Sequence, residues 1–362
     1  MTQSNPTSLT RNVRAGGLAT LAAAYLLFLV IIGGIVTWLL LAGPPESAPT
    51  PVVQTPPPPV TAPSKSEGQT VALDGGKEPA SPASQPSEPD TTAPKSSENY
   101  DPDLVTDSPY GKLPVVGPNG KTAWQTYARP FNPTDDGPRL AIIIEDLGLS
   151  KERTQDAIDK LPPEVTLAFS AYAVGLQDWA DKARAAGHEV ILGIPMEPVS
   201  YPNDDPGPDA LLTTLSPDQN VERLQKVLGR MTGYVGVINS MGSKFTASTT
   251  AITPVLQDLS HRGLLVVDSS ATRLSVAAKI ARSMDIPRAV NNRYIDNDLT
   301  PDAIDGQLAE LEKVAQGYGA AVGIGRAYPV TIDRLAAWIP TLKVKGILIA
   351  PITAVVNRQP IR

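Results

Sequence analysis

At Leu140-Ala141-Ile142-Ile143-Ile144-Glu145-Asp146, five apolar residues run directly into two carboxylates. A short apolar run without polar alternation is typical of a strand that is buried on both faces, as in a parallel sheet. The turn residues Asp136-Gly137-Pro138 precede this run, and an amphipathic segment, 151–160, follows it. The pattern predicts the first strand of a domain that is built from βα units and begins near residue 137.

The same alternation of apolar runs and amphipathic segments continues to the end of the chain, which favours a mostly parallel sheet. The predicted strands are Leu140–Ile144, Val165–Phe169, Glu189–Ile194, Tyr234–Ile238, Leu264–Val267, Val290–Ile295, Ala320–Ile324 and Gly346–Ala350. Helices are predicted between them, with bounds near 151–160, 176–186, 217–229 and 249–260. The expected fold class is α/β, a distorted (β/α) barrel of seven to eight strands, with an open doubly wound sheet as the alternative.

Polar residues follow nearly every predicted strand. In both folds the working site lies at the carboxyl ends of the strands, so these residues are expected to meet at one edge of the sheet. Each of them alone is read as an ordinary turn or helix cap, and only their convergence predicts a site. They are Glu145, Asp146, Ser170, Glu197, Asn239, Ser240, Asp268, Asp296 and Arg326.

The N-terminal part of the chain has a different composition. No charged residue occurs from Ala15 to Pro45, and a helix over residues 18–42, rising ~1.5 Å per residue, is long enough to span a ~30 Å hydrocarbon layer. We expect a transmembrane helix there, and a cleaved signal peptide is the alternative, although such a peptide has a shorter apolar region. Arg11 and Arg14 precede the span, so the positive-inside rule predicts that residues 1–17 are cytoplasmic.

Residues 43–136 are rich in Pro, Ser, Thr and Ala. Such a composition buries too little apolar surface to offset the entropy of ordering, which predicts a disordered linker. Only the segment Trp124–Phe131 is considered for packing on the edge of the domain, which is expected over 137–358. The predicted localisation is therefore the bacterial inner membrane, with one membrane span and a periplasmic or otherwise extracytoplasmic C-terminal domain.

Composition excludes several functions. The formal net charge is −6 with both signs interspersed, so nucleic acid is not an expected partner. There is no cysteine for a thiolate site or nucleophile. The two histidines, His188 and His261, fall where helices end, on the face opposite the expected site, so a Ser-His-Asp triad and a histidine-rich zinc site are not expected. Gly323-Ile324-Gly325 lacks the third glycine of a dinucleotide-binding loop.

Longer motifs accompany the strand ends over residues 139–356. In order, they are Ile142-Ile143-Ile144-Glu145-Asp146-Leu147-Gly148, Gly187-His188-Glu189-Val190 leading into Pro195-Met196-Glu197-Pro198, Asp205-Pro206-Gly207-Pro208, Asn239-Ser240-Met241-Gly242-Ser243-Lys244-Phe245-Thr246, Arg262-Gly263-Leu264-Leu265-Val266-Val267-Asp268-Ser269 and Gly323-Ile324-Gly325-Arg326. In this order they resemble the divergent polysaccharide deacetylase family, a distant branch of the carbohydrate esterases with a NodB-like distorted barrel.

The resemblance implies a metal-dependent hydrolase that deacetylates an envelope polysaccharide, such as a peptidoglycan-like glycan. By position in the family motif, Glu145 would be the catalytic base and Asp146 a metal ligand. The family pattern places histidines where this chain has Ser240 and Arg326, and commonly another where it has Gly193. With Asp146 as the sole inherited ligand, a tetrahedral zinc site is not expected.

A different metal site stays open as an alternative. An oxygen-only site for Mg²⁺, Ca²⁺ or Mn²⁺ is considered, and its ligands would be Glu145, Asp146, Glu197, Asp268 and Asp296. Arg326 argues against this site, because a fixed cation repels a metal ion and is expected to pair with Asp146 instead.

Substrate binding is predicted for side chains at the strand ends and for the polar loops Tyr201–Asp209 and Asn291–Asp298. The predicted substrate-binding residues are Glu197, Asn239, Ser240, Asp268, Asp296 and Arg326. Three functions are compared. A deacetylase-like protein that acts on or binds an envelope glycan, with a degenerate metal site, is favoured. The alternatives are an active deacetylase with an oxygen-only metal site centred on Asp146 and a non-catalytic envelope scaffold.

Overall fold

The computed structural model describes residues 100–132 and 136–360. The predicted cytoplasmic segment 1–17, the predicted membrane span 18–42 and the linker up to residue 99 lie outside the described residues. No helix in the described ranges is both long and apolar enough to cross a bilayer.

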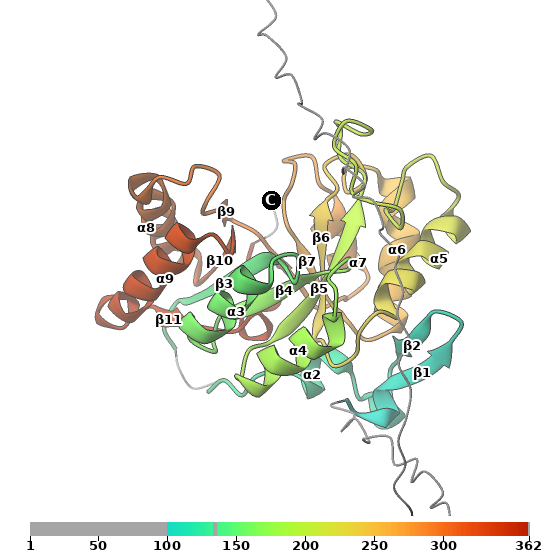
Figure 1. Ribbon diagram of the computed structural model, residues 1–362, viewed down its shortest axis with the longest axis horizontal. Coiled ribbons are helices and arrows are strands. Elements are labelled where there is room, and N and C mark those ends of the chain that lie inside the picture. Colours follow the sequence, from blue (N-terminus) through green and yellow to red (C-terminus); the bar gives the residue numbers. More distant parts are fainter. Residues whose placement is uncertain (1–99, 133–135, 361–362) are drawn as a thin grey trace, which may run out of the picture. The chain divides into compact units, whose positions relative to one another are not determined.

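Nine strands of the described chain form one parallel sheet, in the order β8-β7-β6-β5-β4-β3-β10-β9, with β11 beside the first half of β3 (Figure 1). The bounds are β3 (Arg139–Leu147), β4 (Thr166–Ser170), β5 (Val190–Met196), β6 (Gly236–Met241), β7 (Leu265–Asp268), β8 (Arg288–Val290), β9 (Arg293–Tyr294), β10 (Ala320–Arg326) and β11 (Leu348–Ile349). The predicted first strand, β3, lies in the interior of the sheet, as its unbroken apolar run predicts.

The two ends of this strand order are neighbours in the chain. Only Asn291 and Asn292 separate β8 from β9, so one segment pairs with β7 through its first half and with β10 through its second half. The N–H of Asn291 donates to the carbonyl of Asp268 at 2.9 Å, and the N–H of Asn292 donates to the carbonyl of Val322 at 2.8 Å. The sheet is therefore strongly curved, in agreement with the expected distorted barrel rather than with an open doubly wound sheet.

Helices connect the strands and surround the sheet (Figure 1). They are α3 (Lys151–Lys160), α4 (Leu176–Ala185), α5 (Pro217–Leu228), α6 (Thr249–His261), α7 (Ala277–Ser283), α8 (Pro301–Tyr318) and α9 (Pro329–Leu342). The four helices with predicted bounds, α3 to α6, begin at the predicted residue and end within one residue of the predicted end. Ser150 and Ser216 cap α3 and α5, and at α5 the side chain of Gln219 completes a capping box.

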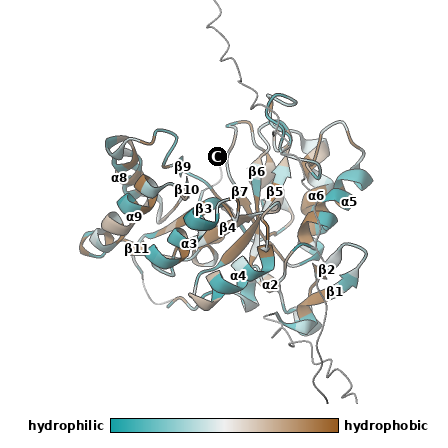
Figure 2. Cartoon of the chain, viewed as in Figure 1, coloured by the Kyte–Doolittle hydropathy of each residue, from teal (hydrophilic) through white to brown (hydrophobic). Residues whose placement is uncertain are grey.

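Successive residues of each strand alternate between two apolar cores, because the pleat turns neighbouring side chains to opposite faces. Ile142 and Ile144 of β3 belong to the core between sheet and helices. Ala141 and Ile143 belong to a smaller core within the curve of the sheet, which the short 3₁₀ helix η4 (Ile352–Val355) also joins. In Figure 2 the central strands are hydrophobic, whereas the surrounding helices carry both colours.

Residues 100–132 differ from the expectation of a disordered linker over 43–136. They contain η1 (Pro102–Leu104), a hairpin of β1 (Val105–Ser108) and β2 (Gly111–Pro114), η2 (Pro118–Gly120) and α2 (Ala123–Thr126). They belong to the same compact unit as the sheet.

Contacts with distant strands explain this order. Trp124, Tyr127 and Phe131 pack against the inner core, and the N–H of Arg129 donates to the buried carboxylate of Glu189 at 2.9 Å. The composition of residues 100–132 does not indicate these contacts, because the residues that bury these side chains lie far away in the sequence. The folded part thus begins by residue 100 rather than at 137, and packing of Trp124–Phe131 on the domain agrees with the expectation.

Candidate functional site

The acidic pair, Glu145 and Asp146, lies at the carboxyl end of β3. In a regular strand the two side chains would point to opposite faces. Here Asp146 has φ of 60°, and the pairing of β3 with β4 shifts between Ile144 and Leu147. This irregularity changes the direction of the Asp146 side chain. Both carboxylates therefore reach the same cation, Arg326.

Arg326 ends β10 and is the register partner of Glu145 in the neighbouring strand. Its Nη2 lies 3.4 Å from Glu145 Oε1, its Nε donates to Asp146 Oδ2 at 3.3 Å, and its Nη1 lies 3.9 Å from Asp296 Oδ1. The guanidinium therefore lies among three carboxylates. Its pairing with Asp146 is the contact expected from the sequence.

Asp296 follows β9 and has a fully buried side chain. Its Oδ2 accepts the backbone N–H of Arg326 at 2.6 Å and the hydroxyl of Thr331 at 3.1 Å. Its Oδ1 is buried and has no hydrogen-bond partner among the described residues. The guanidinium of Arg326 is thus the charge that offsets this oxygen.

Burial shapes the ionisation of the site. Burial, and then the charge of Asp146, raise the pKa of Glu145 to about 8. Burial also raises the pKa of Asp296. Burial opposes the charge on Arg326, but the three carboxylates outweigh it and raise the pKa of the guanidinium. At neutral pH, Glu145 is therefore largely protonated and Arg326 is charged.

A pocket of about 230 Å³ opens beside the acidic pair. This is below the ~300–1,000 Å³ of pockets for drug-sized ligands, so it suits a single ring or the end of a chain. The carboxyl-terminal parts of β3, β4, β5 and β6 and the loops after β3, β4 and β5 contribute its main lining residues, which are Glu145, Asp146, Leu149, Ser170, Tyr172, Gly193, Asp205, Ser240 and Met241. Leu149 and Met241 are 61% and 46% exposed, so the rim is partly apolar.

Five predicted site residues do not line this pocket: Asp296 and Arg326 belong to the ion-pair cluster beside it, and the other three are Glu197, Asn239 and Asp268. Glu197 is buried and accepts from Lys244 Nζ at 2.7 Å and from the Thr213 hydroxyl at 2.6 Å, which fixes two loops. Asn239 bonds to Met241 and Ser269, and Asp268 accepts from the Ser275 hydroxyl at 2.7 Å. Instead of lining the pocket, these side chains brace the loops around the sheet.

Tyr172 and Asp205 also line the pocket; Tyr172 was not predicted, and Asp205 was predicted only as part of a polar loop. The Tyr172 hydroxyl accepts the N–H of Asp209 at 3.2 Å, and Arg230 lies over its ring at 5.3 Å. A side chain at Gly207 would lie within 2.7 Å of that ring, so only glycine fits there. Asp205 falls in the polar loop Tyr201–Asp209, and the polar composition of this loop indicates that side of the pocket.

The sequence model of one family matches residues 142–356, which is more than half of the chain: the divergent polysaccharide deacetylases. The chain belongs to the divergent polysaccharide deacetylase family. This confirms the family that the ordered motifs indicate.

Relatives of this deacetylase-family chain come from several bacteria. The crystal structure of an uncharacterized protein, ATU2773 from Agrobacterium tumefaciens C58, shares 38% sequence identity and a TM-score of 0.66, over 68% of this chain and 100% of that one. An uncharacterized protein of Haemophilus influenzae is 27% identical over 204 residues, which cover 56% of this chain and 72% of the relative. The uncharacterized protein YibQ of Escherichia coli is 24% identical over 208 residues, 56% of this chain and 63% of the relative.

The deacetylase family implies a metal, and the residues of this site do not fit one. Within residues 100–132 and 136–360, no three His, Cys, Asp or Glu side chains are arranged to hold a metal ion. Two of the five considered oxygen ligands, Glu197 and Asp268, bond elsewhere, and Arg326 stands among the other three. A divalent ion there would lie within a few ångströms of the guanidinium and would be repelled by it.

The positions where the family pattern has histidines carry no metal ligand in this chain. Gly193 and Ser240 line the pocket, and Arg326 is bound to the carboxylates. His188 is buried away from the pocket, and its ring contacts the carbonyls of Val165 and Ile158. The arrangement offers hydrogen-bonding and apolar contacts to a ligand.

Proposed function

We propose that this chain displays its deacetylase-family domain on the outer side of the inner membrane, where the domain binds an envelope glycan without deacetylating it. The observation that carries the proposal is the guanidinium of Arg326 among Glu145, Asp146 and Asp296. In this reading the metal site is degenerate, and an internal cation takes the place of the ion.

Chemistry supports the loss of catalysis. Hydrolysis of an acetyl group by this family's route needs a divalent ion that polarises the carbonyl and activates water, and a carboxylate that takes the proton. Arg326 has no open coordination position. Glu145, with a pKa of about 8, holds a proton at neutral pH and is a poor base there.

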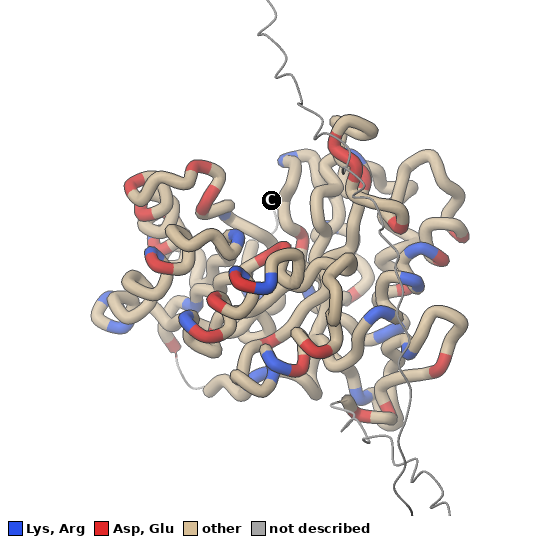
Figure 3. Tube along the Cα trace, in the orientation of Figure 1, with Lys and Arg blue, Asp and Glu red and all other residues tan. Residues whose placement is uncertain are grey.

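The pocket supports glycan binding. Tyr172, Leu149 and Met241 offer apolar surface to the C–H face of a sugar ring, and Asp146, which is 42% exposed, offers a carboxylate to its hydroxyl groups. The family description supports a polysaccharide as the ligand class. The predicted span 18–42 supports placement at the envelope, and the mixture of blue and red in Figure 3 gives no single-sign face for nucleic acid.

The test uses the purified full-length protein. Calorimetric titration with N-acetylglucosamine oligomers is expected to give saturable binding, and Asp146→Asn is expected to weaken it about tenfold, since a hydrogen bond to a charged group contributes about 1.5–3 kcal/mol. Asp159→Asn, on the outer face of α3, is the matched control and is expected to bind like the parent. Acetate release is expected to stay at background.

Each alternative predicts a different result. Acetate release that requires both an added divalent ion and Asp146 would support the active deacetylase with an oxygen-only site. No binding of acetylated or deacetylated glycans would leave the non-catalytic scaffold.

A further inference from the structure

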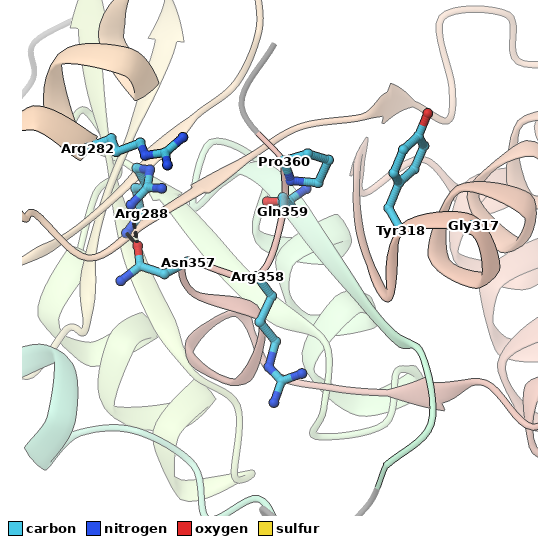
Figure 4. A pocket seen from close by; sticks show the side chains of 8 residues that line it. All are labelled: Arg282, Arg288, Gly317, Tyr318, Asn357, Arg358, Gln359 and Pro360. Atoms are coloured by element: carbon cyan, nitrogen blue, oxygen red, sulfur yellow. Dashed lines mark hydrogen bonds between the residues drawn. The ribbon is translucent and has the colours of Figure 1, made fainter.

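A second pocket lies at the other end of the sheet, at the amino ends of the strands. It has a volume of about 500 Å³. Arg288 is the first residue of β8, and Gly317 and Tyr318 end α8 just before β10 begins. Arg282 near the end of α7 and the C-terminal segment 357–360 complete it (Figure 4). The pocket shares no lining residue with the candidate glycan site.

All charged residues that line this pocket are basic. Three of its lining residues are arginines, Arg282, Arg288 and Arg358, and none is acidic. Across the described ranges, the ion pairs of arginine with carboxylates involve other arginines than these three. Burial, and then the charge of Arg282, lower the pKa of Arg288, while Asp285 partly offsets them. Arg282 and Arg288 thus repel each other, and neither of them forms an ion pair within residues 100–132 and 136–360.

The walls of the pocket are held in place before any ligand arrives. Arg288 Nη1 donates to Asn357 Oδ1 at 2.6 Å, and the N–H of Asn357 donates back to the carbonyl of Arg288 at 2.9 Å (Figure 4). The side chain of Gln359 bonds to both the N–H and the carbonyl of Val290, at 2.8 and 2.6 Å. These bonds tie the C-terminal segment to β8 and fix the guanidinium of Arg288.

One hydrogen-bond donor of the Arg288 guanidinium lacks an acceptor. Arg288 Nε is buried and has no hydrogen-bond partner among the described residues. A buried donor without an acceptor is costly, and an anion bound beside the guanidinium would offset part of this cost through its charge. Guanidinium groups bind phosphate-type oxyanions with paired, charge-assisted hydrogen bonds.

We propose that the pocket of Arg282, Arg288 and Arg358 binds a phosphate group, carried either by a small phosphorylated metabolite or by the headgroup of an anionic lipid. Arg288 holds the oxyanion, with Arg282 beside it and Arg358 on the far side of Asn357. This inference rests on the arginine pocket alone and is independent of the proposed glycan binding.

Calorimetric titration of the full-length protein tests the proposal, with the ionic strength held constant by sodium chloride. The probes are inorganic phosphate, glycerol 3-phosphate and glycerophosphoglycerol, which is the diester headgroup of phosphatidylglycerol. At least one probe is expected to bind saturably, and Arg288→Gln and Arg282→Gln are each expected to weaken it about tenfold or more. Arg273→Gln, which removes the same charge from an exposed loop beyond β7, is expected to bind like the parent.

The probes separate the two sources of phosphate. Tighter binding of the monoesters supports a soluble metabolite, and tighter binding of the diester supports a lipid headgroup. Because Arg282 is exposed, its substitution leaves the fold intact, which a thermal unfolding curve in chloride verifies. No saturable binding of any probe, or binding that both pocket variants retain, would overturn the proposal.

Discussion

Among the carboxylates of the candidate site, Glu145 has the pKa that is raised to about 8. Its pKa is raised from 4.5 to about 8, because burial and then Asp146 disfavour its charged form. The folded state therefore holds this proton more tightly than the unfolded state does. The stability that results is fully present below about pH 4.5 and is lost as the pH rises toward 8.

Replacing Glu145 with Gln tests this linkage. One pKa unit corresponds to about 1.4 kcal/mol, so the rise from 4.5 to about 8 corresponds to about 5 kcal/mol. We therefore expect Glu145→Gln to raise the free energy of unfolding at pH 9 by about that amount, and to change it little at pH 4.5. Urea denaturation at pH 4.5, 7 and 9 measures the difference, with Glu152→Gln on the exposed face of α3 as the control. A variant that is less stable than the parent at pH 9 would contradict the expected sign.

Arg326 is expected to stabilise the fold by neutralising its neighbours. Arg326→Gln leaves the buried Asp296 Oδ1 without a nearby cation. Breaking a fully buried pair costs about 3–5 kcal/mol, and because Arg326 is 36% exposed and screened by water, we expect a loss of about 2 kcal/mol at pH 7. In the double variant with Asp296→Asn the loss is expected to shrink. Equal losses in both backgrounds, measured by urea denaturation, would argue against this pairing.

At the scale of elements, the segment 100–132 forms part of the domain. Removing it uncovers the inner core where Trp124, Tyr127 and Phe131 pack, and it removes the N–H of Arg129 that bonds to buried Glu189. We expect a fragment of residues 137–362 to unfold at a lower urea concentration than one of residues 99–362. The expected difference in the free energy of unfolding is at least about 3 kcal/mol, the cost of losing the packing of one large aromatic side chain. Equal midpoints would restore the boundary at 137.

Strand positions could be predicted because unbroken apolar runs mark buried strands, but pairing could not. Val290–Ile295 is predicted as one strand, and the structure instead has β8 and β9 on either side of Asn291 and Asn292, since the chain passes there from one edge of the sheet to the other. That passage depends on the curvature of the whole sheet. The order of residues 100–132 likewise depends on distant partners.

The candidate site was predictable in part, for a related reason. Glu145, Asp146, Asp296 and Arg326 meet because parallel strands end at one edge. Asn239 and Asp268 follow strands too, but their neighbours Ile238 and Val267 belong to the inner core, so the pleat turns both polar residues outward. Alternate side chains of a strand point to opposite faces of the sheet. Strand register decides which of these two sets enters the pocket, and a single apolar run does not reveal the register.

At the scale of the whole molecule, the predicted anchor determines where the domain works. Alkaline phosphatase, which is active only after export, can be fused to the C-terminus of the full-length chain. We expect an active fusion that stays in the membrane fraction after alkaline extraction, because residues 18–42 suffice for one span. An active but soluble fusion would favour the cleaved signal peptide. An inactive fusion with an intact protein would contradict export.

The metal content of the purified full-length protein tests the degenerate site most directly. After incubation with Zn²⁺, Mn²⁺, Mg²⁺ or Ca²⁺ and dialysis, elemental analysis is expected to find far less than one equivalent of any ion per chain, because the guanidinium of Arg326 already pairs with these carboxylates and repels a metal ion. One equivalent that is retained by the parent and lost in Asp146→Ala would contradict the account, and would return Asp146 to the role of a metal ligand.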